Sequence, residues 1–164
     1  MNVNDRYCSF YYENDDDYGT IEIEPEKTAL LIIDAEYACV KRPQPENPSP
    51  AELENIARWE PFYEKYDKVI IPNLQRLISL CRRTGIEVTY AKIQGFKSNG
   101  RDRSLDQKVS GFNQFLVTSG DHRGDIIQEI APQKEDIVVT KTTDSALTGT
   151  NLRLIPVSYT HLRA

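Results

Sequence analysis

Two charged side chains stand directly after apolar segments, in positions where they could exchange a proton. Asp34 follows the run Ala29–Ile33, and Lys141 follows Ile137–Val139 after one threonine. Short apolar runs bounded by polar residues are typical of strands buried on both faces of a parallel sheet. Ligands bind at the carboxyl edge of such sheets, where a carboxylate beside an ammonium can handle protons. The alternative for Asp34 is a turn or helix cap, which also favours Asp.

The pair requires the two strands to lie close together. Adjacent parallel strands are about 4.7–4.9 Å apart, so a lysine on a neighbouring strand reaches the carboxylate. If the strand that ends at Lys141 neighbours the one that ends at Asp34, the ammonium can therefore reach the carboxylate. The two residues are far apart in the chain, and the sequence pattern does not by itself establish this order.

A helix and a further strand separate these two segments. Val69–Arg83 carries apolar residues at the 3.6-residue period of a helix, and Pro72 places its start near Val69. Gly85 is suited to the position after the helix, and Ile86–Ile93 then forms a strand. Cys81 lies on the apolar face and is expected in the core. The order strand, helix, strand predicts a right-handed parallel crossover.

The segment between Asp34 and this helix is rich in proline. The first half of residues 41–61 predicts an extended loop, and the second half predicts a short helix that ends near Trp59. Ser49 is the expected N-cap, with Pro50 at the first helical position and Glu52 at the third. A loop of this length beside a strand's carboxyl end favours a lid.

Three later segments complete the pattern. Gln94–Phe115 is polar and follows a strand, so it would flank the same cleft, although its alternating charges also suit a solvated, self-paired loop. His122–Ile130 predicts a short helix. Thr142–Thr150 is small and polar, and would supply hydroxyl and N–H groups at the mouth of the site.

Composition excludes several classes of function. The net charge of -5 argues against a general nucleic-acid binder. Three cysteines without paired spacing favour a reducing compartment, and two histidines without a His/Cys cluster give no expectation of a metal site. No segment is apolar and long enough to span a bilayer, and no signal-peptide pattern is present. These features predict a cytoplasmic protein that has no cofactor and binds neither nucleic acid nor membrane.

The chain divides into three parts. Residues 1–24 are expected to form an aromatic arm and an edge strand at Thr20–Glu24. Residues 25–155 form the domain. Residues 156–164 have neither period nor strand pattern, and resemble translated adapter sequence. We expect them to be a non-native tail on a truncated frame.

Several of these segments together resemble the isochorismatase-like cysteine hydrolases, from about Ile23 to Leu154. The segment Gly100–Phe112 is similar in particular to the biuret-hydrolase and ureide-amidohydrolase branch. The resemblance implies an α/β three-layer sandwich with a parallel sheet, incomplete here at its C-terminus. The other matching segments are Thr28–Asp34, Ile86–Ile93, Val138–Lys141, Ser145-Ala146 and Gly149–Leu152.

The resemblance also implies an Asp–Lys–Cys triad. Asp34 would take the proton of a cysteine thiol, and Lys141 would stabilise negative charge and hold the aspartate. The cysteine would attack an amide or ureide carbonyl and release ammonia or an amine. Ser145, Thr150 and Phe112 would contact the substrate. No metal or other cofactor is implied, and the full-length protein is expected to be a homo-oligomer.

The sequence departs from the family pattern in two places. The family's cysteine lies downstream of the lysine, beyond residue 164, whereas Cys39 and Cys81 lie elsewhere, so this chain alone is expected to be inactive. Glu36 stands where the family more often has glutamine. We therefore expect a fragment of a hydrolase that cleaves a C–N bond of a small, biuret-like amide. The alternatives are a non-catalytic binding or oligomerisation module, or an isochorismatase or nicotinamidase relative.

Overall fold

Three parallel strands form the centre of the structure. The computed structural model describes residues 10–12, 23–109 and 116–155. Within these residues β2 lies between the other two strands and runs parallel to both. All three strands occur where the apolar runs predict them. They are β1 (Ala29–Ile33), β2 (Glu87–Ile93) and β3 (Ile137–Lys141).

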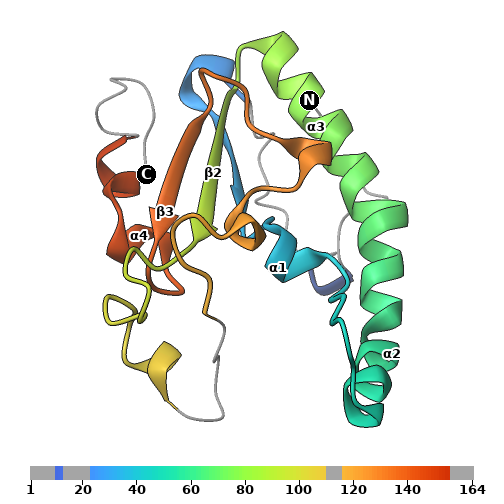
Figure 1. Ribbon diagram of the computed structural model, residues 1–164. Coiled ribbons are helices and arrows are strands. Elements are labelled where there is room, and N and C mark those ends of the chain that lie inside the picture. The colour runs from blue at the N-terminus through green and yellow to red at the C-terminus, as the bar shows by residue number, and fades with distance from the viewer. Residues whose placement is uncertain (1–9, 13–22, 110–115, 156–164) are drawn as a thin grey trace.

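Helical segments lie on both sides of this sheet, as the predicted α/β three-layer class requires. Figure 1 shows α3 (Ile71–Thr84) on one side of the strands and α4 (Ala146–Gly149) on the other. Ile78 of α3 belongs to the larger core with the β1 and β2 side chains. A smaller core joins β2 and β3 to Ala146 and Leu152. The sheet is therefore the middle layer of three.

The prediction that β1 is buried on both faces is wrong. Ile32 is 5% exposed, but Leu31 and Ile33 on the opposite face are 38% and 51% exposed. β1 is an edge strand of the described sheet, and the segment from Ala146 to Leu152 covers that face only at β2 and β3. The unbroken apolar run thus reports strand propensity but not two-sided burial.

The helical region between β1 and β2 is longer than predicted. α2 (Pro50–Lys65) passes through a π-helical turn, η4 (Tyr66–Ile70), directly into α3, and the backbone stays helical at both junctions. The predicted break near Trp59 and new start near Val69 are therefore wrong. Pro72 is tolerated because it lies in the first turn of α3, after the π turn has changed the hydrogen-bond register.

The predicted signals at the two ends of this helical region are confirmed. The Ser49 hydroxyl accepts a hydrogen bond from the Glu52 backbone N–H at 3.3 Å, and the Glu52 carboxylate accepts one from the Ser49 N–H at 2.8 Å. This reciprocal capping box starts α2. Gly85 ends α3 in the left-handed conformation, and Cys81 is buried in the core.

The predicted helix at His122–Ile130 is replaced by two short turns. Between them the Ile127 N–H donates to the Ala35 carbonyl at 3.0 Å, and Ile126 forms an isolated bridge with Glu36. Pairing with the segment after β1 uses the backbone groups that a helix would have needed. The short helical elements are α1 (Tyr37–Val40), η2 (Phe10–Tyr12), η3 (Pro25–Lys27), η5 (Asp106–Lys108), η6 (His122–Gly124), η7 (Gln128–Ile130) and η8 (Asn151–Arg153).

The ends of the chain are only partly described. Ile23 and Glu24 are not in a strand, and the rest of the predicted edge strand lies outside the described residues, as does the predicted tail at 156–164. Among the helices that the structure describes, none has the length and apolarity needed to cross a membrane.

Candidate active site

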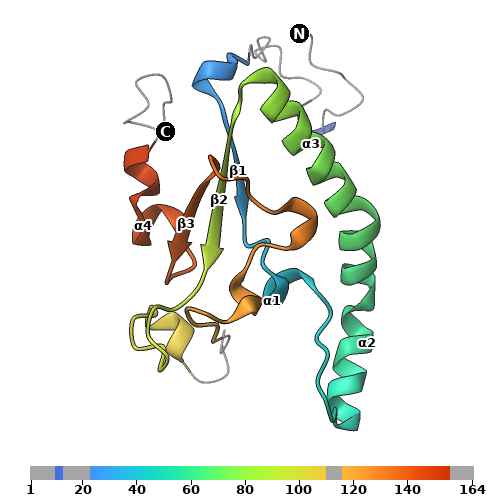
Figure 2. The same cartoon turned by 45° about the horizontal axis from the view of Figure 1, so that its top comes forward.

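The carboxyl ends of the three strands meet at one edge of the sheet, close to α1 (Figure 2). Ile33 is paired with Ala91 on β2, and Ile93 is paired with Lys141 on β3. Asp34 follows the last residue of β1, and Lys141 is the last residue of β3. The predicted pair therefore lies at the edge where parallel sheets bind ligands.

Lys141 and Asp34 form an ion pair past the end of the central strand. The Lys141 Nζ lies 2.8 Å from the Asp34 Oδ1. Their strands are not neighbours, because β2 lies between them. The long lysine side chain nevertheless spans this gap. Its side chain is 1% exposed and that of Asp34 is 43% exposed, so the ammonium is buried while the carboxylate is open to solvent on one side.

The backbone of Asp34 turns the carboxylate toward the site. Asp34 has a φ of 56°, in the left-handed region that Asp and Asn adopt more readily than most other residues. Its N–H donates to the Ala91 carbonyl at 3.0 Å, which continues the β1–β2 pairing for one residue. The chain then leaves the sheet toward α1. An aspartate here satisfies both this turn and the contact with Lys141.

Glu36 is a further member of the site. The residue is 1% exposed, and its Oε1 accepts a hydrogen bond from the backbone N–H of Ile93. Burial raises the pKa of Glu36 to about 6, and the charge of Asp34 adds to this rise, against the Ile93 hydrogen bond and the charge of Lys141. A buried carboxyl beside an ion pair has no apolar periodicity to mark it. The available sequence signals are its position two residues after Asp34 and the glutamine that the family more often has there.

Cys39 lies beside these carboxyl groups on α1. Burial raises the pKa of its thiol to about 12, and the negative charges of Glu36 and Asp34 add to the rise. A thiol reacts as its thiolate, which this environment disfavours. Of the cysteines that the structure describes, Cys39 is thus held protonated and Cys81 is buried in the core. Neither has the surroundings of a nucleophile.

Cys39 should therefore react slowly with iodoacetamide at pH 8. A rise in thiol pKa from 9.0 to about 12 reduces the thiolate fraction on the order of 1,000-fold. Peptide mass spectrometry would give the labelling rate in the native chain and in urea. Glu36→Gln should increase the native rate, because it removes one of the repelling charges. Native labelling as fast as in urea would contradict this environment.

The Asp34 Oδ1 and the Lys141 Nζ are buried and lie 2.8 Å apart, so each is the other's partner in a charge-assisted contact. Neither these two atoms nor the buried Glu36 Oε2 has a hydrogen-bond partner outside this cluster among the described residues. Buried polar groups are normally hydrogen-bonded, and exceptions gather at functional sites. The cluster can therefore accept and donate hydrogen bonds to a small polar ligand.

The residues predicted to contact a substrate are not brought together by described contacts. The Ser145 hydroxyl accepts from the Thr148 N–H at 3.2 Å and caps α4. The Thr150 hydroxyl donates to the Ala146 carbonyl and accepts from the Leu152 N–H. Phe112 lies outside the described residues. Local capping accounts for both hydroxyl residues, and their predicted role with substrate stays a prediction.

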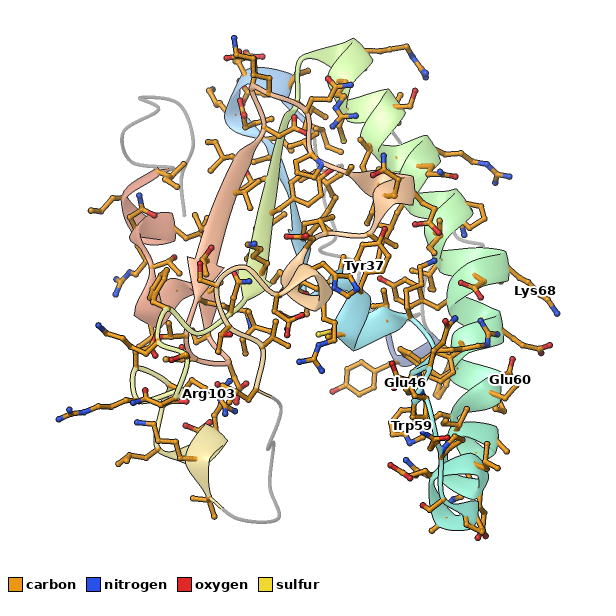
Figure 3. The ribbon with its side chains drawn as sticks, viewed as in Figure 1. Tyr37, Glu46, Trp59, Glu60, Lys68 and Arg103 are labelled. Atoms are coloured by element: carbon orange, nitrogen blue, oxygen red, sulfur yellow. The ribbon has the colours of Figure 1, made fainter. Side chains whose placement is uncertain are left out.

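The loop after β2 is more ordered than a solvated loop would be. Gln107 is 2% exposed and donates to the Asp144 carboxylate at 2.8 Å. The Ser104 N–H donates to the carbonyl of Thr142, the residue after Lys141. Figure 3 shows Arg103 on this loop, beyond the carboxyl edge of the sheet. The loop therefore packs beside the end of β3, as expected for a segment that flanks the site.

The described residues contain no cluster of three or more His, Cys, Asp or Glu side chains arranged to hold a metal ion. A sequence model of the isochorismatase domain matches residues 28–156. The chain belongs to the isochorismatase family. The match includes all three strands, both residues of the ion pair and Glu36, so the site just described lies inside the family domain.

The chain is also similar to individual proteins, in sequence or in fold. An isochorismatase from Bacillus subtilis (strain 168) is 36% identical over 80 residues, which are 49% of this chain and 24% of that protein. A cysteine hydrolase from Pseudomonas syringae pv. phaseolicola 1448A has the same fold, with a TM-score of 0.62 at 20% identity over 84% of this chain and 56% of that one. An N-carbamoylsarcosine amidase from Thermoplasma acidophilum has a TM-score of 0.52 at 20% identity, over 80% and 61%.

The isochorismatase-family chain thus spans less than two thirds of the length of these relatives. The solved structures establish the fold: a parallel sheet with helices on both faces.

Proposed function

We propose that this chain supplies the base and the cation of a cysteine hydrolase that cleaves a C–N bond in a small amide or ureide. The observation that carries the proposal is the buried Lys141 ammonium, 2.8 Å from the Asp34 carboxylate at the carboxyl edge of the sheet. The names of two structural neighbours, a cysteine hydrolase and an N-carbamoylsarcosine amidase, are consistent with it.

The chemistry follows from the charges of the pair. Asp34 accepts the proton of a cysteine thiol, and Lys141 stabilises the negative charge in the buried site. The thiolate attacks the substrate carbonyl, and the C–N bond breaks. The protonated amine or ammonia departs, and the acyl group stays on the cysteine as a thioester. Water then hydrolyses the thioester and restores the thiol. Each step conserves atoms and electrons without a redox partner.

In this proposal the nucleophile is a cysteine downstream of Lys141, as the family resemblance implies, and neither described cysteine takes this role. Cys81 is buried in the core, and the surroundings of Cys39 hold its thiol protonated. The proposed cysteine lies in a longer protein, on a further strand-to-helix turn downstream of β3 and α4. This chain would then have two members of a three-residue catalytic site.

A ureide or biuret-like substrate is the preferred class. The Gly100–Phe112 segment resembles the biuret-hydrolase branch, and its described part packs against Thr142, next to Lys141. Ser145, Thr150 and Phe112 are the proposed substrate contacts. A urea-type carbonyl flanked by N–H groups would meet carboxylate acceptors and an ammonium donor in the cluster.

The test begins with the gene beyond Ile155. We expect a cysteine codon on the next strand-to-helix turn, and a protein that includes it should release ammonia from biuret or an N-carbamoyl amine. The 164-residue chain is the matched control and should release none. Release of ammonia from nicotinamide alone would favour a nicotinamidase relative instead. No downstream cysteine, or no turnover of any amide, would leave a non-catalytic module and overturn the proposal.

A further inference from the structure

Glu36 is held more firmly than a side chain that merely fills space. Its backbone carbonyl accepts from the Cys39 and Val40 N–H groups at 3.0 and 3.1 Å, and its backbone bridges to Ile126. Its Oε1 accepts from Ile93, the residue paired with Lys141. Its carboxyl is therefore fixed at the ends of β1 and β2, next to the ion pair.

One cation, the Lys141 ammonium, lies near two carboxyl groups, those of Asp34 and Glu36. Asp34 at the end of β1 and Lys141 at the end of β3 both act electrostatically on Glu36. Cys39 on α1 and Tyr66 on η4 face it as further ionisable groups. With Glu36 protonated, the Asp34 and Lys141 charges balance. With Glu36 ionised, the buried cluster carries one excess negative charge.

We infer that Glu36 is a positioning residue that shares Lys141 with Asp34, so that its charge state controls how tightly Lys141 holds Asp34. Protonated Glu36 leaves the ammonium to Asp34. Ionised Glu36 offers its second, buried oxygen and draws the ammonium from Asp34. Only the consequence of this sharing for hydrolysis rests on the proposed function.

The transfer of the Lys141 ammonium from Asp34 to Glu36 should occur near pH 6, because the pKa of Glu36 is about 6. The Asp34 carboxylate should thus be released from Lys141 as the pH rises through this value. In the proposed hydrolase, a released carboxylate is a freer proton acceptor. The full catalytic rate would then require ionised Glu36 as well as ionised Asp34.

The substitution Glu36→Gln separates this function from a structural one. The amide oxygen that it introduces can still accept the Ile93 N–H, and the side chain has nearly the same shape, but it cannot ionise. A side chain needed only to tie β1 to β2 would work equally well as glutamine. A side chain that acts through its charge would not.

The test is a pH titration by NMR between pH 4.5 and 8, with ¹⁵N-labelled lysine and ¹³C-labelled glutamate. In the wild-type chain we expect the Lys141 ¹⁵Nζ signal to show a step near pH 6, with the same midpoint as the Glu36 ¹³Cδ signal. In Glu36→Gln this step should be absent. Glu129→Gln is the matched control, because Glu129 is bound to Lys41 rather than to Lys141, and the step should persist.

Either of two results would overturn the inference. One is a Glu36 titration with no accompanying Lys141 step in the wild type, which needs no variant to fold. The other is an unchanged Lys141 step in Glu36→Gln. Because the signals are read without turnover, they are independent of the proposed function. In a hydrolysing protein, Glu36→Gln should also remove the inflection near pH 6 from kcat/KM. An absence of all hydrolysis, with the NMR step present, would count against the proposed function alone.

Discussion

Replacing Lys141 with methionine should reduce C–N bond hydrolysis about 100- to 1,000-fold, the usual cost of removing one preorganised group that stabilises developing negative charge. Methionine preserves most of the buried stem and removes the charge, so the β3 packing is retained. Lys141→Ala would have the same catalytic effect but would add a cavity. Asp34 would lose its cation, although its partial exposure lets water solvate the carboxylate.

Ammonia release by the longer protein would measure this effect, with circular dichroism as a check that the fold is retained. Lys92→Met is the matched control: Lys92 lies on β2, and its Nζ is 3.9 Å from the exposed Asp125 carboxylate. The control should retain most of the activity. Near-normal turnover in Lys141→Met would refute the assignment of Lys141 to the catalytic site.

Glu36 should make the chain less stable at neutral pH than in mild acid. Its pKa rises from 4.5 to about 6 on folding, because burial disfavours the ionised form. The folded state therefore holds the proton more tightly than the unfolded state. The stabilisation is fully present below pH 4.5 and is lost as the pH rises through 6. The expected loss is roughly 2 kcal/mol, from about 1.4 kcal/mol per pKa unit.

Urea unfolding of the wild type and of Glu36→Gln between pH 4 and 7.5 would show this loss. Titrations that the two chains share cancel when the unfolding free energy of one is subtracted from that of the other. As the pH rises, the wild type should lose roughly 2 kcal/mol of stability relative to Glu36→Gln. Glu129→Gln serves again as the control, because Glu129 is exposed and paired with Lys41. Parallel curves for the wild type and Glu36→Gln would show that Glu36 is not buried as described.

The Asp34–Lys141 ion pair was predictable because each residue follows a short apolar run. Strand propensity is local, and Asp34 and Lys141 are marked by position relative to Ala29–Ile33 and Ile137–Val139. The layered α/β class follows from the alternation of such strands with a helix. The strand order does not, because β1 and β3 contact β2 rather than each other. Local patterns carry no record of which strand lies in the centre.

Other features depended on tertiary contacts that no local pattern encodes. The segment 125–127 pairs with residues 35–37, so the predicted helix at His122–Ile130 does not form. The helix breaks predicted from proline do not occur in the α2–α3 region. Pro61 lies inside α2, and a π turn precedes Pro72. Figure 3 shows Trp59 on the part of α2 that extends away from the sheet. The sequence marks Glu36 as a departure from the family pattern, but its burial and its hydrogen bond from Ile93 emerge only from the fold.

The placement of β2 between its two partners also sets when the site can exist during synthesis. Asp34 and β2 can associate early, but Lys141 reaches them only after the last residue of β3 has left the ribosome and paired with Ile93. Contacts between residues so distant in the chain form late and slowly. Until then Asp34 is an ordinary solvated carboxylate. The ion pair therefore reports that β1, β2 and β3 have assembled, and a nascent chain that ends before β3 cannot form it.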